Sequence, residues 1–363
     1  MLSKQLGKHS NKGKVSIWPY LSTYSLDSVC QTVMGVNINA QSNHDTPILV
    51  CMNRLLNMVC ERIFHLWLQP DWLYKLFPQY KEYSEYKRRV YVFSDDIIEK
   101  KRQEIEIENL NKTEAEAQYD LGSYKNQTFL DLLIHLSGRE HGFTNEELRE
   151  EMLTLTVAGT DTSAVAMGYT IKMLSKYPDI QEKVYQEIYD IFGDSDRPLD
   201  KEDLPRLKYL ERVVKETLRL FPPVPFVIRK IEEDTKLPSG KILPAGSGVP
   251  VSIWGVHRDP KYWGEDAETF DPDRFLPERF NLKHTCSYMP FSQGPRNCLG
   301  YQYALMSIKT AITTLLRNYK VVGEPEKTSI PYIRTKIDIM MKDVNEYEIS
   351  LERRIPAAKT TTT

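Results

Sequence analysis

The sequence lacks the cysteine patterns of disulfide-stapled and zinc-binding domains. Its five cysteines, an odd number in 363 residues, stand at irregular positions: Cys30, Cys51, Cys60, Cys286 and Cys298. They form neither a disulfide framework nor a zinc-ligand pattern. This usage suits a reducing compartment.

The chain also lacks an excess of either positive or negative charge. The chain has 48 basic and 50 acidic residues, and its formal net charge is −2. Because nucleic acid requires a basic face, we expect no nucleic-acid partner. Internal repeats are absent, and 41% of the residues are hydrophobic, which is ample for the core of a globular protein.

A signal peptide and an N-terminal apolar anchor are not visible either, because residues 1–17 are polar and basic. The most nearly membrane-spanning stretch is Met152 to Ile171. Its centre carries Asp161 between Thr160 and Thr162, an arrangement that is costly in lipid. We therefore predict a buried helix here.

Apolar periodicity predicts a mainly α chain with small β-sheets. The expected helices cover residues 18–34, 48–68, 79–108, 129–136, 144–176, 179–192, 205–221 and 301–316. Residues 109–127 are polar and are expected to form a surface loop. Two hairpins are expected, one pairing 227–231 with 248–253 around Ser239-Gly240, and one pairing 337–341 with 347–351.

The most informative stretch is the loop from Phe291 to Gly300, which carries Cys298. Its glycines, among them Gly294, allow a tight turn and a close approach to a bound group. The helix predicted after it places Cys298 at a positive helix end, which favours a thiolate. We expect a buried thiolate metal ligand, with Arg296 able to hold an anionic group. A lone structural cysteine in a turn is the alternative.

This F-x-x-G-x-R-x-C-x-G loop resembles the haem-binding loop of the cytochromes P-450, in which a cysteine thiolate is the axial iron ligand. Within the superfamily the chain resembles the animal microsomal clan that includes fatty-acid ω-hydroxylases. The resemblance implies haem b with Cys298 as axial ligand, held also by Phe291, Gly294, Arg296 and Gly300. It assigns Arg229 to a haem propionate as well.

The predicted helix over 144–176 resembles the long central helix of the same family in its Ala158–Ser163 segment. Glycine and neighbouring threonines are unfavourable at a helix centre, so a local distortion is expected there. The resemblance implies that Asp161 and Thr162 deliver protons to bound dioxygen. A close helix crossing at Gly159 is the alternative.

Glu216 and Arg219 match the family's E-x-x-R element, in which the two side chains face each other on a helix. We expect Arg274 to complete this structural clamp. The tetrapeptide Pro277-Glu278-Arg279-Phe280 resembles the family's P-E-R-F more literally, and we interpret it as a decoy.

Three departures from the family are visible. Gln293 replaces a small residue of the haem loop. Ala158 stands where many members of the clan carry a glutamate that esterifies haem, so the haem is expected to be non-covalent. The chain also opens where the family is already inside its catalytic domain, so the N-terminal part of the fold is expected to be missing, with residues 1–355 forming an incomplete catalytic domain and 356–363 a disordered tail.

The resemblance implies a haem-thiolate monooxygenase, with a long central helix over the haem and the cysteine loop on the proximal side. The substrate would be a fatty acid, steroid, terpenoid or xenobiotic, and O₂ the co-substrate. Electrons would come from an NADPH-dependent flavoprotein reductase docking near Lys215 and Lys283. The full-length form is expected on the cytoplasmic face of the endoplasmic reticulum membrane. A truncated remnant that binds haem poorly or acts only through partners is the alternative. Haem-dependent isomerase chemistry is a second one, against which Asp161 and Thr162 argue together.

Overall fold

The computed structural model describes residues 1–42, 46–111, 127–137, 142–280 and 284–354. Most of the expected polar loop and the expected tail lie outside these residues. The described helices are α1 (Leu2–Gly7), α2 (Trp18–Val29), α3 (Pro47–Phe64), α4 (Asp71–Tyr74), α5 (Gln79–Asn111), α7 (Phe129–Ser137), α8 (Asn145–Lys176), α9 (Pro178–Phe192), α10 (Lys208–Leu220), α11 (Ile253–Val256), α12 (Pro260–Trp263) and α13 (Tyr301–Leu316).

The strands are short and pair antiparallel. They are β1 (Lys14–Val15), β2 (Phe226–Lys230), β3 (Thr235–Lys236), β4 (Ile242–Leu243), β5 (Gly248–Ser252), β6 (Tyr319–Val322), β7 (Thr335–Asp338), β8 (Met340–Asp343) and β9 (Ile349–Arg353). β1, β9 and β6 form one sheet, while β2–β5, β3–β4 and β7–β8 form two-stranded ribbons. The expected mainly α chain with small sheets is confirmed.

Local chemistry determines the limits of α8, the long helix. Thr144 and Glu147 form the expected capping box: the Glu147 amide donates to Thr144 Oγ1 at 3.2 Å, and the Thr144 amide donates to Glu147 Oε2 at 2.8 Å. Pro178 starts the next helix. α8 is 32 residues long, and all of the residues 158–163 are α-helical, so the expected distortion does not break the helix.

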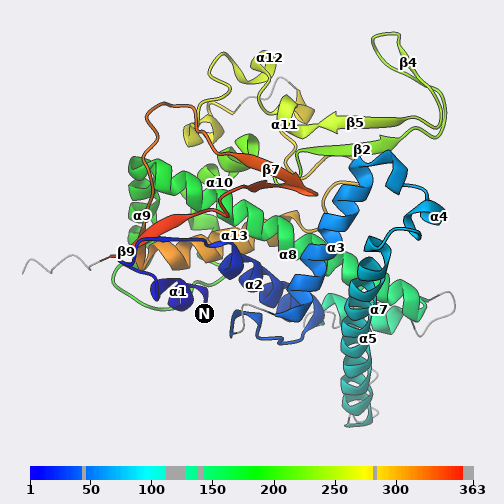
Figure 1. Ribbon diagram of the computed structural model, residues 1–363. Helices are drawn as coiled ribbons and strands as arrows, with labels where there is room; N and C mark the ends of the chain where they lie inside the picture. Colours follow the sequence, from blue (N-terminus) through cyan, green and yellow to red (C-terminus); the bar gives the residue numbers. More distant parts are fainter. Residues whose placement is uncertain (43–45, 112–126, 138–141, 281–283, 355–363) are drawn as a thin grey trace, which may run out of the picture. The chain divides into compact units, whose positions relative to one another are not determined.

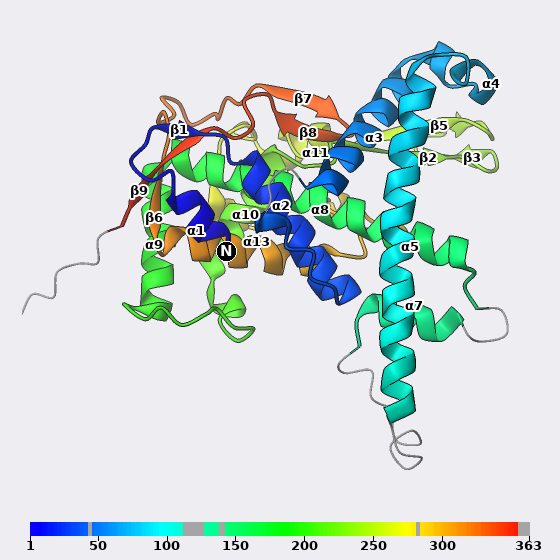
Figure 2. The same ribbon diagram turned by 60° about the horizontal axis from the view of Figure 1, so that its bottom comes forward.

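The chain divides into two compact units, Met1–Trp18 with Thr162–Thr363, and Pro19–Asp161. Their boundary falls within α8. In the second unit α3 packs against α5, and α4 lies in the connection between them (Figure 2). α2 continues into a π-helical turn that ends at Gly35, whose φ of 70° suits glycine.

In the first unit, α10 packs against α9 and α13. Buried aliphatic side chains of these helices and of α8 contribute to its core: Val165, Ile171, Leu174, Val214, Ile312 and Leu315. The β2–β5 ribbon extends into the β3–β4 hairpin (Figure 1). Gly240 has a φ of 83° in the turn, so this hairpin is as predicted.

The second predicted hairpin is wrong. β7 pairs with β8, whereas β9 pairs with β1 and β6. The chain reverses at Ile339, which has a φ of 57°. Because a β-branched residue rarely adopts this conformation, the sequence gives no turn signal at this point.

Candidate functional site

The Cys298 loop is a turn closed by its own backbone. The Cys298 amide donates to the Phe291 carbonyl at 2.9 Å, and the Asn297 amide donates to the Gly294 carbonyl at 3.1 Å. Gly294 has a φ of 86° and open space where a Cβ would stand, so its glycine is required by conformation and not by crowding.

The sulfur of Cys298 is accessible. Residues 293–299 are all exposed, so the expected burial of this thiol is wrong for the polypeptide by itself. Backbone hydrogen bonds shape this turn but do not cover the cysteine side chain, which lies just before α13. Gly300 is the N-cap of α13, so Cys298 lies at the positive end of a 16-residue helix, as expected.

The two arginines assigned to propionates lie in the same unit as the loop. Arg229 is on β2, is half-buried, and donates through Nη2 to Ser292 Oγ at 3.3 Å. Arg296 is exposed within the loop. One guanidinium is therefore held against the loop by a hydrogen bond, and the other is carried by the loop itself.

Glu216 and Arg219 form a bidentate ion pair on α10. Arg219 Nε lies 2.7 Å from Glu216 Oε2 and Nη2 lies 2.8 Å from Oε1, with both side chains fully buried. Nη1 also donates to the carbonyls of His257 and Ala267. A charge pair this deeply buried requires such additional partners.

The structure brings Arg274, and not Arg279, to this pair. Arg274 Nε lies 3.6 Å from Glu216 Oε1. Its Nη2 donates to Asp266 Oδ2 at 2.8 Å, a partner that the sequence did not indicate. Arg279 instead pairs with Asp271 at 2.8 Å, with 47% of its side chain exposed.

The central residues of α8 face different surroundings. Asp161 is 4% exposed, whereas Thr162 is half-buried and Ala158 is exposed. Ala158 and Thr162 are four residues apart and share one helix face. A Cβ on Gly159 would lie 2.8 Å from Val29 Cγ2, so α2 crosses closely at this glycine.

His257 is a residue of this region to which the sequence assigned no role. It is fully buried, and its ring contacts the backbone of Arg219 and of Met289. Burial lowers the pKa of its imidazole from 6.5 to about 3, so the ring is neutral. The signal that could have found it is the run His257-Arg258-Asp259-Pro260, which resembles an element of the cytochromes P-450.

The other cysteines differ from Cys298 in their surroundings. Cys30, Cys51 and Cys60 are buried, whereas Cys286 is exposed. Burial, and to a smaller degree Asp27, raises the pKa of Cys30 to about 12. Within the described ranges, no group of three His, Cys, Asp or Glu side chains is arranged to hold a metal ion.

The family model for cytochrome P450 matches residues 1–349. This chain belongs to the cytochrome P450 family. The resemblance predicted from its sequence is confirmed, and family membership implies haem with a cysteine thiolate ligand.

This P450 is 34% identical over 355 residues to cytochrome P450 4V2 of Homo sapiens, covering 98% of the chain and 66% of the relative. It is 36% identical over 327 residues to cytochrome P450 4c3 of Drosophila melanogaster, covering 88% and 61%. With cytochrome P450 4c21 of Blattella germanica it shares 33% over 356 residues, covering 98% and 69%. The chain thus spans less than two thirds of the human and fruit-fly relatives.

The donor set fits haem. The sulfur of Cys298 is accessible to an iron, and the space beside Gly294 in the same turn is open. The guanidinium groups of Arg229 and Arg296 lie in the same unit and could pair with the two propionate carboxylates of haem. Ala158 offers no carboxylate for an ester.

Proposed function

We propose that this P450 is a haem-thiolate monooxygenase that inserts one atom of O₂ into a lipophilic small molecule. The second oxygen atom leaves as water, and NADPH supplies the two electrons. Cys298 carries the proposal, as an exposed thiol in a glycine turn directly before α13. A thiolate ligand gives haem iron the electron density that favours O–O cleavage. Residues 1–355 are proposed as one catalytic domain.

The proposed cofactor is non-covalent haem b. Cys298 would be its axial ligand, with Phe291, Gly294 and Gly300 shaping the turn. Arg229 and Arg296 would hold the propionates. Support comes from the hydrogen bond of Arg229 to Ser292, which directs a cation toward the loop.

Thr162 and Asp161 are proposed to hold and move protons for dioxygen. The partial exposure of Thr162 suits a hydroxyl that contacts a ligand. Asp161 is buried one residue earlier, and there it would act as a source of protons for Thr162 rather than as a contact.

We assign Glu216, Arg219 and Arg274 a structural role. Their charges are satisfied by one another, by Asp266 and by backbone carbonyls. These contacts join α10 to the segment around residues 266–274, which precedes the cysteine loop in the chain.

The proposed electron donor is an NADPH-dependent flavoprotein reductase. A hollow of about 220 Å³ lies beside the cysteine loop, and its lining includes Lys215, Phe291, Gln293 and Tyr301. Lys215 pairs with Glu211 at 2.8 Å, so an acidic partner would have to compete with this carboxylate for the lysine. Lys283 lies outside the described residues.

We propose that this P450 associates with the cytoplasmic face of the endoplasmic reticulum membrane. None of the helices in the described ranges is long and apolar enough to cross a bilayer. The end of α3 and the connection to α5, however, expose large apolar side chains, here called the α3–α5 tip: Ile63, Phe64, Leu66, Trp67, Trp72 and Leu76.

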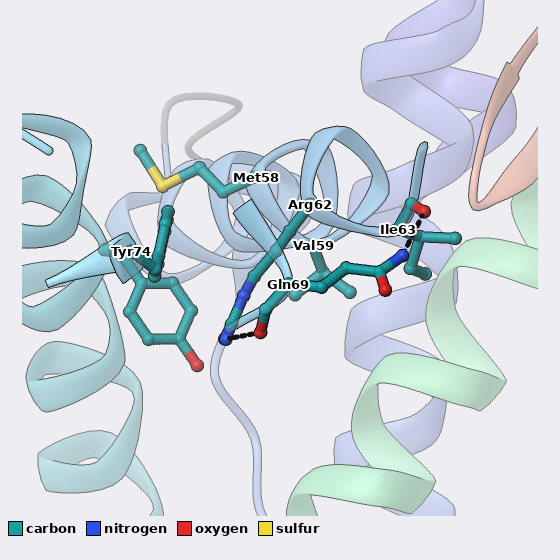
Figure 3. A pocket seen from close by; sticks show the side chains of 7 residues that line it. Met58, Val59, Arg62, Ile63, Gln69 and Tyr74 are labelled. Carbon is teal, nitrogen blue, oxygen red and sulfur yellow. Dashed lines mark hydrogen bonds between the residues drawn. The ribbon is translucent and has the colours of Figure 1, made fainter. Parts of the chain in front are cut away.

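A groove of about 280 Å³ adjoins the tip: Ile63 of the tip lines it together with Met58, Val59, Arg62 and Tyr74. Arg62 lies between Tyr74 and the Gln69 carbonyl, to which it donates (Figure 3). Exposed tryptophans are typical of membrane interfaces, so the tip is proposed to enter the lipid surface.

The test of the proposed function is the ferrous–CO spectrum of the haem-loaded protein. Cys298→Ser should abolish the thiolate signature, whereas Cys286→Ser, which changes the other exposed cysteine, should leave it intact. An unchanged spectrum in Cys298→Ser would overturn the assignment. Failure of the unaltered chain to take up haemin would favour the remnant without catalysis.

A further inference from the structure

His257 lies between the buried clamp and the cysteine loop. It is fully buried and caps the C-terminal end of α11. Its backbone carbonyl accepts from Arg219 Nη1 at 2.8 Å, so the clamp holds its main chain in place.

Both ring nitrogens have backbone partners. Nδ1 lies 3.1 Å from the carbonyl oxygen of Arg219. The amide of Met289 donates to Nε2 at 2.9 Å. Since a carbonyl can only accept and an amide can only donate, these partners determine one neutral tautomer, with the proton on Nδ1.

Met289 is a buried residue two positions before the cysteine loop. It is 8% exposed, and its carbonyl accepts from the Ser292 amide at 3.0 Å. Phe291, two residues later, accepts from the Cys298 amide. The segment 293–299 is exposed, so its position depends on how its ends are held.

We propose that His257 is a positioning residue that connects the Arg219 backbone to the start of the Cys298 loop and thereby sets the place of the sulfur relative to the haem. This inference rests on the proposed role of Cys298 as iron ligand. The neutral ring is essential because a proton on Nε2 would repel the Met289 amide. The lowered pKa of His257 keeps that nitrogen free to accept.

Two substitutions of His257 test the roles of its two ring nitrogens separately. The amide of His257→Asn can replace Nδ1 as donor to Arg219 but does not reach Met289. The longer His257→Gln can place its oxygen near the Nε2 position and accept from Met289. Tyr288→Phe is the matched control, because the Tyr288 ring stacks on the His257 ring with 5.3 Å between centroids, whereas its hydroxyl donates to the backbone carbonyl of Lys215.

The ferrous–CO spectrum gives the ratio of protein that shows the thiolate signature to protein that has lost it. Haem content and the unfolding midpoint are measured on the same samples. In His257→Asn we expect this ratio to fall roughly tenfold, equivalent to about 1.4 kcal/mol. His257→Gln should restore most of it. Tyr288→Phe should lower the unfolding midpoint without changing the ratio. An unchanged ratio in His257→Asn would overturn the proposal.

If His257→Asn yields no folded protein, His257→Phe keeps the ring volume, lacks both nitrogens, and should show the same loss. Hydrogen exchange provides a second test that uses only the unaltered protein. The Met289 amide should exchange as slowly as the buried amides of α10. Exchange as fast as that of residues 293–299 would overturn the inference. Cys298→Ser is measured in parallel, since a retained thiolate signature there defeats the proposed function itself.

Discussion

Arg274 Nε lies 3.6 Å from Oε1 of Glu216, a carboxylate that is completely buried. The same oxygen accepts from the Asp271 amide at 2.9 Å. One carboxylate thus contacts α10 through Arg219 and the 271–274 turn through a guanidinium and an amide. The integrity of this region depends on keeping its charges paired.

Removing Arg274 should therefore be far more damaging than removing Arg279. Arg274→Ala leaves buried Glu216 with one cation fewer, and we expect a loss of about 3–5 kcal/mol in the free energy of unfolding. Arg279→Ala breaks only an exposed pair and should cost less than about 1 kcal/mol. Urea unfolding of the two variants measures both, and equal losses would contradict the clamp.

Thr162→Ala should divert electrons to peroxide while leaving haem content intact. The reason is the loss of a hydroxyl on the accessible face of α8. Thr156→Ala is the control, because that buried hydroxyl donates to the Met152 carbonyl at 2.7 Å. The measurement is the ratio of product formed to NADPH consumed in each variant. A normal ratio in Thr162→Ala would mean that Thr162 has only a structural role.

Acidified organic solvent should extract all the haem from the loaded protein. An ester requires a carboxylate, and Ala158 has none, although its position is exposed. Ala158→Glu supplies one on the helix face of Thr162 and should retain haem on the denatured chain after turnover. Retention by the unaltered protein would show that another carboxylate esterifies the haem.

His257 should make stability depend on pH. The pKa of His257 falls from 6.5 to about 3 because of burial; the hydrogen bond to the Arg219 backbone opposes this shift, and the charges of Arg219 and Arg258 add to it. Between these values the unfolded chain binds a proton that the folded chain does not, so stability is lost as the pH falls, by up to about 1.4 kcal/mol per pH unit.

His257→Gln should remove this component, leaving only the slope due to carboxylates. Denaturant unfolding at several pH values within the window compares the two slopes. Identical slopes would mean that the His257 ring is not neutral and buried as described.

Features encoded by neighbouring residues were predictable from the sequence. The capping box of Thr144 and Glu147 determined the start of α8, and Pro178 its end. The choice of Arg274 over Arg279 required only spacing along the chain, and the geometry agrees with it.

Features that depend on distant contacts were not predictable. His257 meets Met289 across 32 residues, and no local pattern encodes that bond. Ile339 adopts a backbone conformation against its own preference, so the hairpin was assigned to the wrong strands. The accessibility of Cys298 depends on which side chains pack around the loop, and composition does not reveal that.

The distribution of the five thiols has a practical consequence for labelling. Three are buried and two are exposed, so an impermeant maleimide applied to the folded protein should modify only Cys286 and Cys298. Cys286→Ser would then leave one addressable sulfur, located in the proposed ligand loop. A fluorophore on that sulfur would report the movements of the loop directly, and its attachment should compete with haemin for the same atom.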